Sequence, residues 1–141
     1  MNPLSILGPV GALAGWTLLI SALIPLTRFR AAFAKQVTAD DFKVGESARV
    51  PEAVRVPNRV YINLFEAPVL FYVVCLILYV THAVDLWFVA MAWVYVALRL
   101  GHSLIYLTYN RVIHRLTLFG LSGLLLGAIW IRATVLLALS Y

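Results

Sequence analysis

Four stretches of about twenty or more mostly apolar residues limit what this chain can fold into. They run from about 4 to 27, 61 to 81, 86 to 106 and 116 to 140. Roughly 20 apolar residues in a helix cross the hydrocarbon core of a bilayer. With 63% hydrophobic and 12% charged residues, the chain is more apolar than a soluble domain, whose apolar share is about half. The sequence therefore predicts an all-α integral membrane protein, a four-transmembrane-helix bundle that forms one domain over residues 1–141.

The basic residues between these stretches predict the orientation in the membrane. Six of them lie in the segment 28–58, namely Arg28, Arg30, Lys35, Lys43, Arg49 and Arg55. The connection 81–85 has neither Lys nor Arg, and the third connection carries Arg111 and Arg115. Because Lys and Arg favour the cytoplasmic side, we expect a cytoplasmic loop over about 28–58 and termini outside the cytoplasm of a bacterial inner membrane. This topology accounts for the net charge of +5, so the charge does not indicate a nucleic-acid partner.

The connections themselves contain short structural signals. Thr38 and Asp41 have the spacing of a helix cap. Pro51 and Pro57 are expected to bound a short irregular piece before the second apolar stretch. The very short connection between the second and third stretches predicts an antiparallel helical hairpin. The first stretch exceeds the roughly 7–15 residues of a signal-peptide core, so we expect a retained helix.

The second apolar stretch begins with polar side chains at helical spacing. Arg59, Asn63 and Glu66 stand at i, i+4 and i+7, so they share one face of a helix. A carboxylate inside a membrane helix is costly unless it is paired or hydrated. We therefore expect Glu66 to point into the bundle, with Arg59 or Arg99 as its partner. A structural ion pair that only fixes helix register fits the same pattern.

The third apolar stretch carries a second polar face. Arg99, His102 and Tyr106 stand at i, i+3 and i+7 and line one side of a helix. Arg111 and Arg115 follow in the next connection. Arginines at a membrane end often extend to lipid headgroups, and a single interior histidine is more often structural than catalytic. A binding site is favoured because many hydrogen-bond donors lie at the same depth in the membrane.

An antiparallel hairpin brings both polar faces to the cytoplasmic half of the bilayer. We expect one site there, formed by Arg28, Arg59, Asn63, Glu66, Arg99, His102, Tyr106 and Arg115. Guanidinium groups bind carboxylates, a carboxylate binds an ammonium group, and a side-chain amide binds peptide groups. The set predicts an anionic, peptide-like ligand.

Other chemistries find no support in the residue spacing. No cluster of Cys and His has metal-ligand spacing, and there is neither a glycine-rich phosphate loop nor a serine nucleophile motif. The single cysteine, Cys75, lies deep in the second stretch and can form no intrachain disulfide. Arg132 lies about nine residues from the chain end, and we expect it to extend outward or to pair near Tyr141.

The order and spacing of the polar residues resemble the MAPEG superfamily, the membrane-associated proteins in eicosanoid and glutathione metabolism. The similarity rests on Arg59-x-x-x-Asn63-x-x-Glu66, on Arg99-x-x-His102-x-x-x-Tyr106 and on the following Arg115. Its spacing is closest to the microsomal prostaglandin E synthase branch. Two positions differ from that branch, since Pro68 follows Glu66 by two residues instead of four and Leu116 replaces a serine after the arginine.

The resemblance implies a homotrimer of four-helix subunits that binds glutathione, without a metal, between neighbouring subunits. An apolar co-substrate would enter from the bilayer. By this likeness glutathione is held by Arg28, Arg59, Asn63, Glu66, His102 and Tyr106. Arg115 falls where the family has an arginine that stabilises the thiolate, and Arg111 is the competing candidate for that role. A nearby guanidinium lowers the pKa of a thiol, and the thiolate is the reactive form.

The sequence therefore predicts a bacterial-type glutathione transferase or peroxidase that attacks a lipophilic electrophile or lipid hydroperoxide with a thiolate. Two other functions stay open. A non-catalytic member of the same fold would use the cleft for lipid ligands, although it would not need the combination of Arg59, Asn63, Glu66 and Tyr106. A small four-helix multidrug transporter also relies on a membrane glutamate, but it needs neither the long charged loop nor the arginine cluster.

Overall fold

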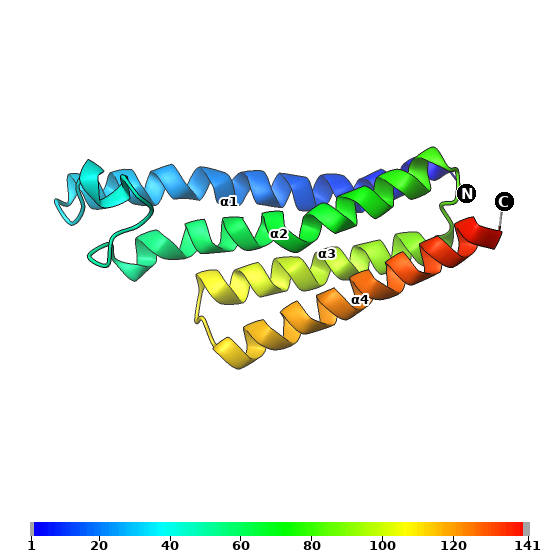
Figure 1. Ribbon diagram of the computed structural model, residues 1–141. Helices are drawn as coiled ribbons and strands as arrows, with labels where there is room; N and C mark the ends of the chain where they lie inside the picture. The colour runs from blue at the N-terminus through cyan, green and yellow to red at the C-terminus, as the bar shows by residue number, and fades with distance from the viewer. Residues whose placement is uncertain (1, 140–141) are drawn as a thin grey trace.

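Four long helices lie side by side in the computed structural model, which describes residues 2–139 (Figure 1). In chain order the elements are η1 (Pro3–Ile6), α1 (Leu7–Phe33), η2 (Ala39–Phe42), α2 (Glu52–Val80), α3 (Leu86–Leu107) and α4 (Val112–Leu139). Both termini and the α2–α3 turn lie at one end of the bundle, and the segment with η2 lies at the other. Ser140, the expected end of the last apolar stretch, lies outside the described residues.

All four helices are long and apolar enough to cross a membrane. The expected fold class, an all-helical bundle of four membrane-spanning helices, is thereby confirmed. Large apolar side chains cover the outer surface, including Leu18 on α1 and Leu124 on α4, which are 71% and 76% exposed. Such a surface suits lipid tails or neighbouring subunits.

The helices extend further than the apolar stretches alone suggest. α1 continues through Pro25 to Phe33, and α2 begins at Glu52. Pro57 therefore lies inside a helix, and the expected irregular piece between Pro51 and Pro57 is wrong. A proline removes only one backbone hydrogen bond and clashes locally, so a long helix can continue past it. Pro51, as the N-cap of α2, marks the boundary instead.

The core is built from one apolar face of each helix. Leu13, Phe71, Tyr95 and Ile129, one from each helix in order, are all 2% exposed or less. The rings of Phe71 and Tyr95 stack with centroids 4.6 Å apart. Interdigitated side chains of this kind fix how the helices sit against one another.

Asp41 organises the segment between α1 and α2. Its carboxylate accepts hydrogen bonds from the backbone N–H of Thr38 at 2.9 Å and from the hydroxyl of Ser47 at 2.7 Å. Arg49 adds an ion pair at 3.3 Å. The expected cap at Thr38 and Asp41 is confirmed, since both halves of a capping box are present. These bonds, with the one from Ser47 the largest cause, lower the pKa of Asp41 to about 2.

The same segment is anchored to the end of α1 by Arg28. The Arg28 guanidinium lies 3.2 Å from the Glu46 carboxylate and 4.5 Å from the centre of the Phe42 ring. Arg28, expected in the glutathione site, is thus engaged with the connection that follows its own helix.

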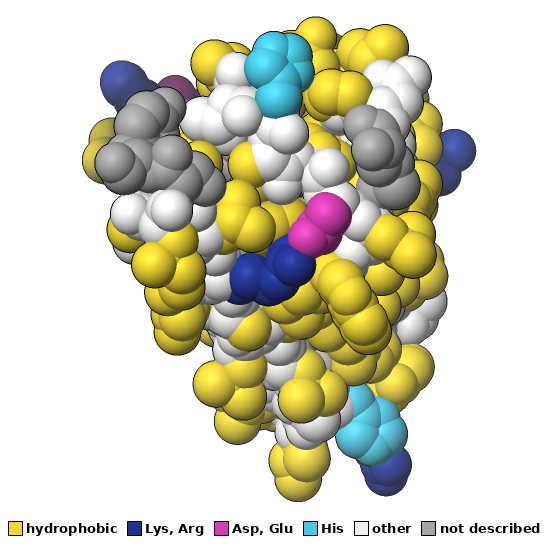
Figure 2. All heavy atoms as spheres, turned by 90° about the vertical axis from the view of Figure 1, so that its right-hand side faces the viewer, with side chains coloured by type: hydrophobic (Ala, Val, Ile, Leu, Met, Phe, Trp, Pro, Cys, Tyr) yellow, Lys and Arg dark blue, Asp and Glu magenta, His cyan; other side chains and the backbone are white. Residues whose placement is uncertain are grey.

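The opposite end of the bundle is held by an ion pair between Asp85 and Arg132. Arg132 Nη1 donates to Asp85 Oδ1 at 3.0 Å, Nη2 bonds the second oxygen, and the guanidinium lies 4.2 Å from the Phe88 ring centre. Figure 2 looks onto this end and shows an acidic side chain against a basic one amid hydrophobic side chains. Asp85 is a partner that the sequence analysis did not name for Arg132, because α4 brings Arg132 to the N-cap of α3. The expected pairing near Tyr141 lies outside the described residues.

Asp85 has two roles at this position. Its Oδ1 also accepts from the backbone N–H of Phe88 at 2.9 Å, which caps α3. The hydrogen bond from Arg132 is the main cause that lowers the pKa of the Asp85 carboxyl below its usual range. The start of α3 and the last third of α4 are therefore tied through one carboxylate.

The bonds to Asp41 predict that Asp41→Asn loosens the segment 34–51. Because the folded segment lowers the Asp41 pKa, the ionised carboxylate stabilises it above the ordinary pKa near 3.8, and that stabilisation is lost as pH falls toward about 2. At neutral pH, hydrogen exchange at the amides of Thr38 and Ser47 should be faster in Asp41→Asn. Asp40→Asn is the matched control and should exchange like the parent. Equal exchange in both variants would contradict the role of Asp41.

The ion pair at the other end predicts a coupling between Asp85 and Arg132. Asp85→Asn keeps a capping side chain but loses the charge, and Arg132→Gln removes the partner. In a double-mutant cycle measured by detergent unfolding, we expect a coupling of about 0.5–1 kcal/mol, since both side chains are partly exposed and screened. Strictly additive losses would show that the pair does not stabilise the bundle.

Candidate functional site

Polar side chains from three helices line one cavity of about 230 Å³. Asn63 comes from α2, His102 and Tyr106 from α3, and Arg115 from the first turn of α4. The rest of the wall is apolar and consists of Val112, Leu116 and Phe119. The structure thus brings together four of the residues expected in the glutathione site.

Arg115 is held in this wall by contacts on two sides. Its guanidinium carbon lies 3.9 Å from the centre of the Tyr106 ring, a cation–π contact. Its Nη1 donates to Asn110 Oδ1 at 2.8 Å. One nitrogen of the guanidinium is therefore directed by the protein, and Nε and Nη2 make no hydrogen bond within the described chain and are open to a ligand.

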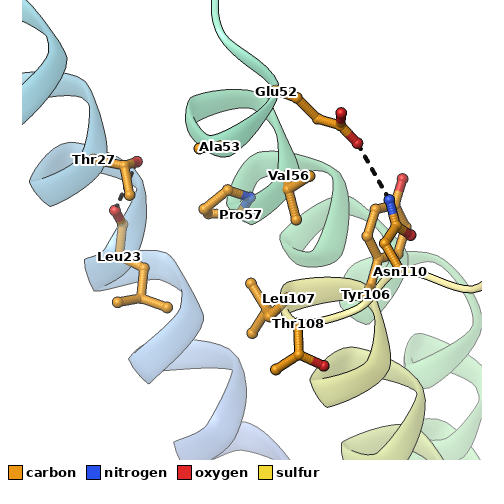
Figure 3. Close-up of a pocket in the computed structure, with 10 residues that line it drawn as sticks. All are labelled: Leu23, Thr27, Glu52, Ala53, Val56, Pro57, Tyr106, Leu107, Thr108 and Asn110. Carbon is orange, nitrogen blue, oxygen red and sulfur yellow. Dashed lines mark hydrogen bonds between the residues drawn. The ribbon is translucent and has the colours of Figure 1, made fainter.

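Asn110 is a site residue that the sequence reasoning passed over. It has a φ of 46° at the turn after α3, a conformation that asparagine tolerates better than most residues. Its side chain accepts from Arg115 and donates to Glu52 at 3.4 Å. Figure 3 shows the bond between Glu52 and Asn110 at the rim of the adjoining cavity. An asparagine directly after an apolar helix is a turn signal. This signal could have predicted that the chain turns at Asn110.

Arg99 lies behind the cavity wall and is 1% exposed. Its Nε donates to the Tyr95 hydroxyl at 3.1 Å, whereas Nη1 and Nη2 are buried without a hydrogen-bond partner. The guanidinium lies 4.9 Å from the ring centre of Phe119, which lines the cavity. Phe119, another residue that the sequence reasoning missed, also lies 5.8 Å from the His102 ring.

Two further cavities adjoin the first through Tyr106. One of about 560 Å³ is lined mainly by apolar side chains of α1, α2 and α3, among them Leu23, Val56 and Leu107 (Figure 3). The other, of about 180 Å³, has Arg59 in its wall. Tyr106 lines all three cavities, so the small polar cavity and the larger, more apolar one meet at this residue.

Glu66 and Arg111 lie apart from these cavities. Both side chains are exposed, and the part of the chain that the structure describes gives them no hydrogen-bond or ion-pair partner. The expectation that Glu66 points into the bundle is wrong. The buried face of α2 carries Val60 and Leu64, and the polar face beside it turns outward within the single chain. A carboxylate at membrane depth needs a partner, and the described residues of this chain supply none to Glu66.

The chemistry available in the polar cavity is that of anion binding. Arg115 offers guanidinium donors, His102 and Tyr106 offer a ring nitrogen and a hydroxyl, and Asn63 offers an amide. Across residues 2–139, no group of three or more His, Cys, Asp and Glu side chains is arranged to hold a metal ion. The arrangement suits a ligand with negative charge and peptide groups.

The chain matches a model of a known protein family. The model described as the MAPEG family matches residues 6–135, which takes in nearly all of the four helices and every residue of the cavities. Comparisons with curated proteins and with solved structures give no match.

Proposed function

Because this chain belongs to the MAPEG family, we propose that it is a glutathione-dependent membrane transferase or peroxidase. Its co-substrate is a lipophilic electrophile or a lipid hydroperoxide. The observation that carries the proposal is the convergence of Asn63, His102, Tyr106 and Arg115 on one cavity. Four polar side chains from three apolar helices are costly to gather at membrane depth unless they serve a ligand.

Glutathione meets complementary groups around this cavity. A carboxylate of glutathione suits the guanidinium group of Arg59, and its amides suit Asn63. Its sulfur lies beside Arg115, whose cation favours the thiolate over the thiol. The thiol proton passes to solvent, and the thiolate is the attacking nucleophile.

The co-substrate occupies the larger cavity on the other side of Tyr106. That cavity has a volume of about 560 Å³, and most of the residues that line it are apolar. With an aromatic halide, the sulfur forms a bond to carbon and the halide leaves with the bonding electrons. With a hydroperoxide, the thiolate attacks the terminal oxygen and forms a sulfenic acid, while the alkoxide leaves and takes up a proton. The thiol of a second glutathione then attacks the sulfenic sulfur, and the disulfide forms as water leaves. Both reactants are then bound next to the Tyr106 ring, and this proximity lowers the barrier to a reaction between two molecules.

The functional unit is an oligomer, with a trimer as the expected state. Glu66 lies on an exposed face of α2 together with Ile62, Phe65 and Val69, which are 44%, 51% and 47% exposed. Lipid tails cannot solvate a carboxylate, whereas a neighbouring subunit can supply a donor. A closed ring of subunits would bury this face and complete the site from a second chain.

The thiolate role predicts that Arg115→Ala loses turnover more than glutathione affinity. Removing the cation beside the sulfur should reduce kcat for conjugation of an aromatic halide at least tenfold, while Kd for glutathione changes less than about threefold. The ultraviolet absorption of bound thiolate near about 240 nm should fall in parallel.

Arg111→Ala is the matched control, because Arg111 is an exposed arginine of the same turn. It should keep both the parent kcat and the thiolate absorption. If Arg111→Ala loses turnover and Arg115→Ala does not, the thiolate role belongs to Arg111.

If purified parent binds neither glutathione nor S-hexylglutathione at millimolar concentration, a non-catalytic lipid-binding function replaces the proposal.

The exposed carboxylate predicts that Glu66→Gln weakens the assembly rather than the single chain. Native mass spectrometry after mild extraction should show trimer for the parent and a larger monomer fraction for Glu66→Gln. Glu52→Gln makes the same chemical change at the first residue of α2. It should leave the trimer fraction unchanged. A parent that is monomeric under these conditions would contradict the proposed assembly.

A further inference from the structure

The guanidinium of Arg99 is the largest unsatisfied polar group in the described part of the bundle. Arg99 is 1% exposed, and neither Nη1 nor Nη2 has a hydrogen-bond partner. An arginine stays charged in a protein interior, and a buried charge without hydrogen bonds is strongly unfavourable. Its two free donors lie in the fork geometry that binds a carboxylate through two parallel hydrogen bonds.

The hydroxyl of Tyr95 holds this guanidinium from one side. It accepts from Arg99 Nε at 3.1 Å, one helical turn away on α3. Tyr95 itself is 0% exposed, and its ring stacks on Phe71 at a centroid distance of 4.6 Å. The tyrosine is therefore rigid, and its single hydrogen bond takes up Nε and leaves both Nη groups unused.

Phe119 covers the other side and separates Arg99 from the polar cavity. Its ring centre lies 4.9 Å from the Arg99 guanidinium carbon, and the ring also forms part of the cavity wall. His102, one turn further along α3, lines the same wall and contacts Phe119. Phe119 is 39% exposed, so much of its ring is not packed against other residues of this chain.

We propose that Tyr95 is a positioning residue, which fixes Arg99 so that Nη1 and Nη2 bind a carboxylate of the thiol co-substrate when Phe119 swings aside. The inference rests on the proposed function and adds to it a concealed carboxylate position behind the cavity wall. A bound carboxylate supplies the acceptor that Arg99 lacks. The sulfur is held elsewhere, by Arg115, so Tyr95 governs binding and not the chemical step.

The test compares glutathione with glutathione diethyl ester, in which both carboxylates are blocked, by calorimetry on the purified parent and on Tyr95→Phe. The phenylalanine ring keeps the stacking on Phe71 and loses only the hydroxyl. We expect glutathione to bind about five- to tenfold more weakly to Tyr95→Phe, whereas binding of the diester changes less than twofold. In conjugation assays KM for glutathione should rise by the same factor and kcat should stay within twofold of the parent.

Tyr72→Phe is the control, because Tyr72 is a partly buried tyrosine of α2 that does not touch Arg99. It should bind both ligands as the parent does. If Tyr95→Phe does not fold, Arg99→Lys serves instead, since it keeps the charge but lacks Nε and the planar fork. It should likewise weaken glutathione binding selectively over diester binding.

The outcomes separate this inference from the proposed function. Equal weakening of glutathione and diester in Tyr95→Phe marks a purely structural role and overturns the inference. So does unchanged binding of both. A parent that binds no glutathione overturns the proposed function and this inference together, whereas a parent that binds and conjugates glutathione with an unaffected Tyr95→Phe overturns the inference alone.

Discussion

The cost of placing charge inside hydrocarbon is the constraint on which this structure depends. The four helices are apolar enough to cross a membrane, and each charged group within them needs compensation. Arg115 lies on the Tyr106 ring and bonds Asn110, and Arg132 pairs with Asp85. Among the described residues the guanidinium of Arg99 bonds the Tyr95 hydroxyl and otherwise contacts aromatic rings. The described chain does not supply Arg99 and Glu66 with enough hydrogen-bond or ion-pair partners. A ligand or a neighbouring subunit can provide the missing ones.

A carboxylate organises each end of the bundle, and the one at Asp85 joins two of the helices that carry site residues. Asp85 joins the start of α3 to α4 through Arg132. At the other end, Asp41 closes the segment 34–51 on itself. The Asp85–Arg132 pair at one end and the short α3–α4 connection at the other keep these two helices at a fixed relative height, so Tyr106 on α3 and Arg115 on α4 remain within contact distance. A slip of one helical turn, about 5.4 Å, would remove that contact.

Tyr106 links the polar and apolar halves of the proposed site. It faces the cavity with Asn63, His102 and Arg115 and also the larger apolar cavity beside Leu23 and Val56. A membrane enzyme that joins a hydrophilic thiol to a lipophilic partner needs such a boundary, because each reactant arrives from a different solvent. Asn110 adds a connection at the rim, where its amide bridges Glu52 and Arg115.

The sequence by itself determined the fold class, the family and the four polar residues of the smaller polar cavity. Apolar length predicts membrane helices because backbone polar groups must be satisfied inside the bilayer, and the spacing of Asn63, His102, Tyr106 and Arg115 predicts shared helix faces. The family expectation is confirmed by the match over residues 6–135. These properties depend on local periodicity, which a single sequence displays.

Only the tertiary structure decided which polar side chains meet. Glu66 shares a helical face with Asn63, yet it turns outward because α2 packs through Val60 and Leu64. Arg28 turns to Glu46, and Arg132 turns to Asp85. Periodicity defines a face of a helix but not the neighbour that the face meets, since that depends on how all four helices pack. Phe119 and Tyr95 were missed for the same reason, because an aromatic side chain in an apolar helix gains a role only from the charge packed against it.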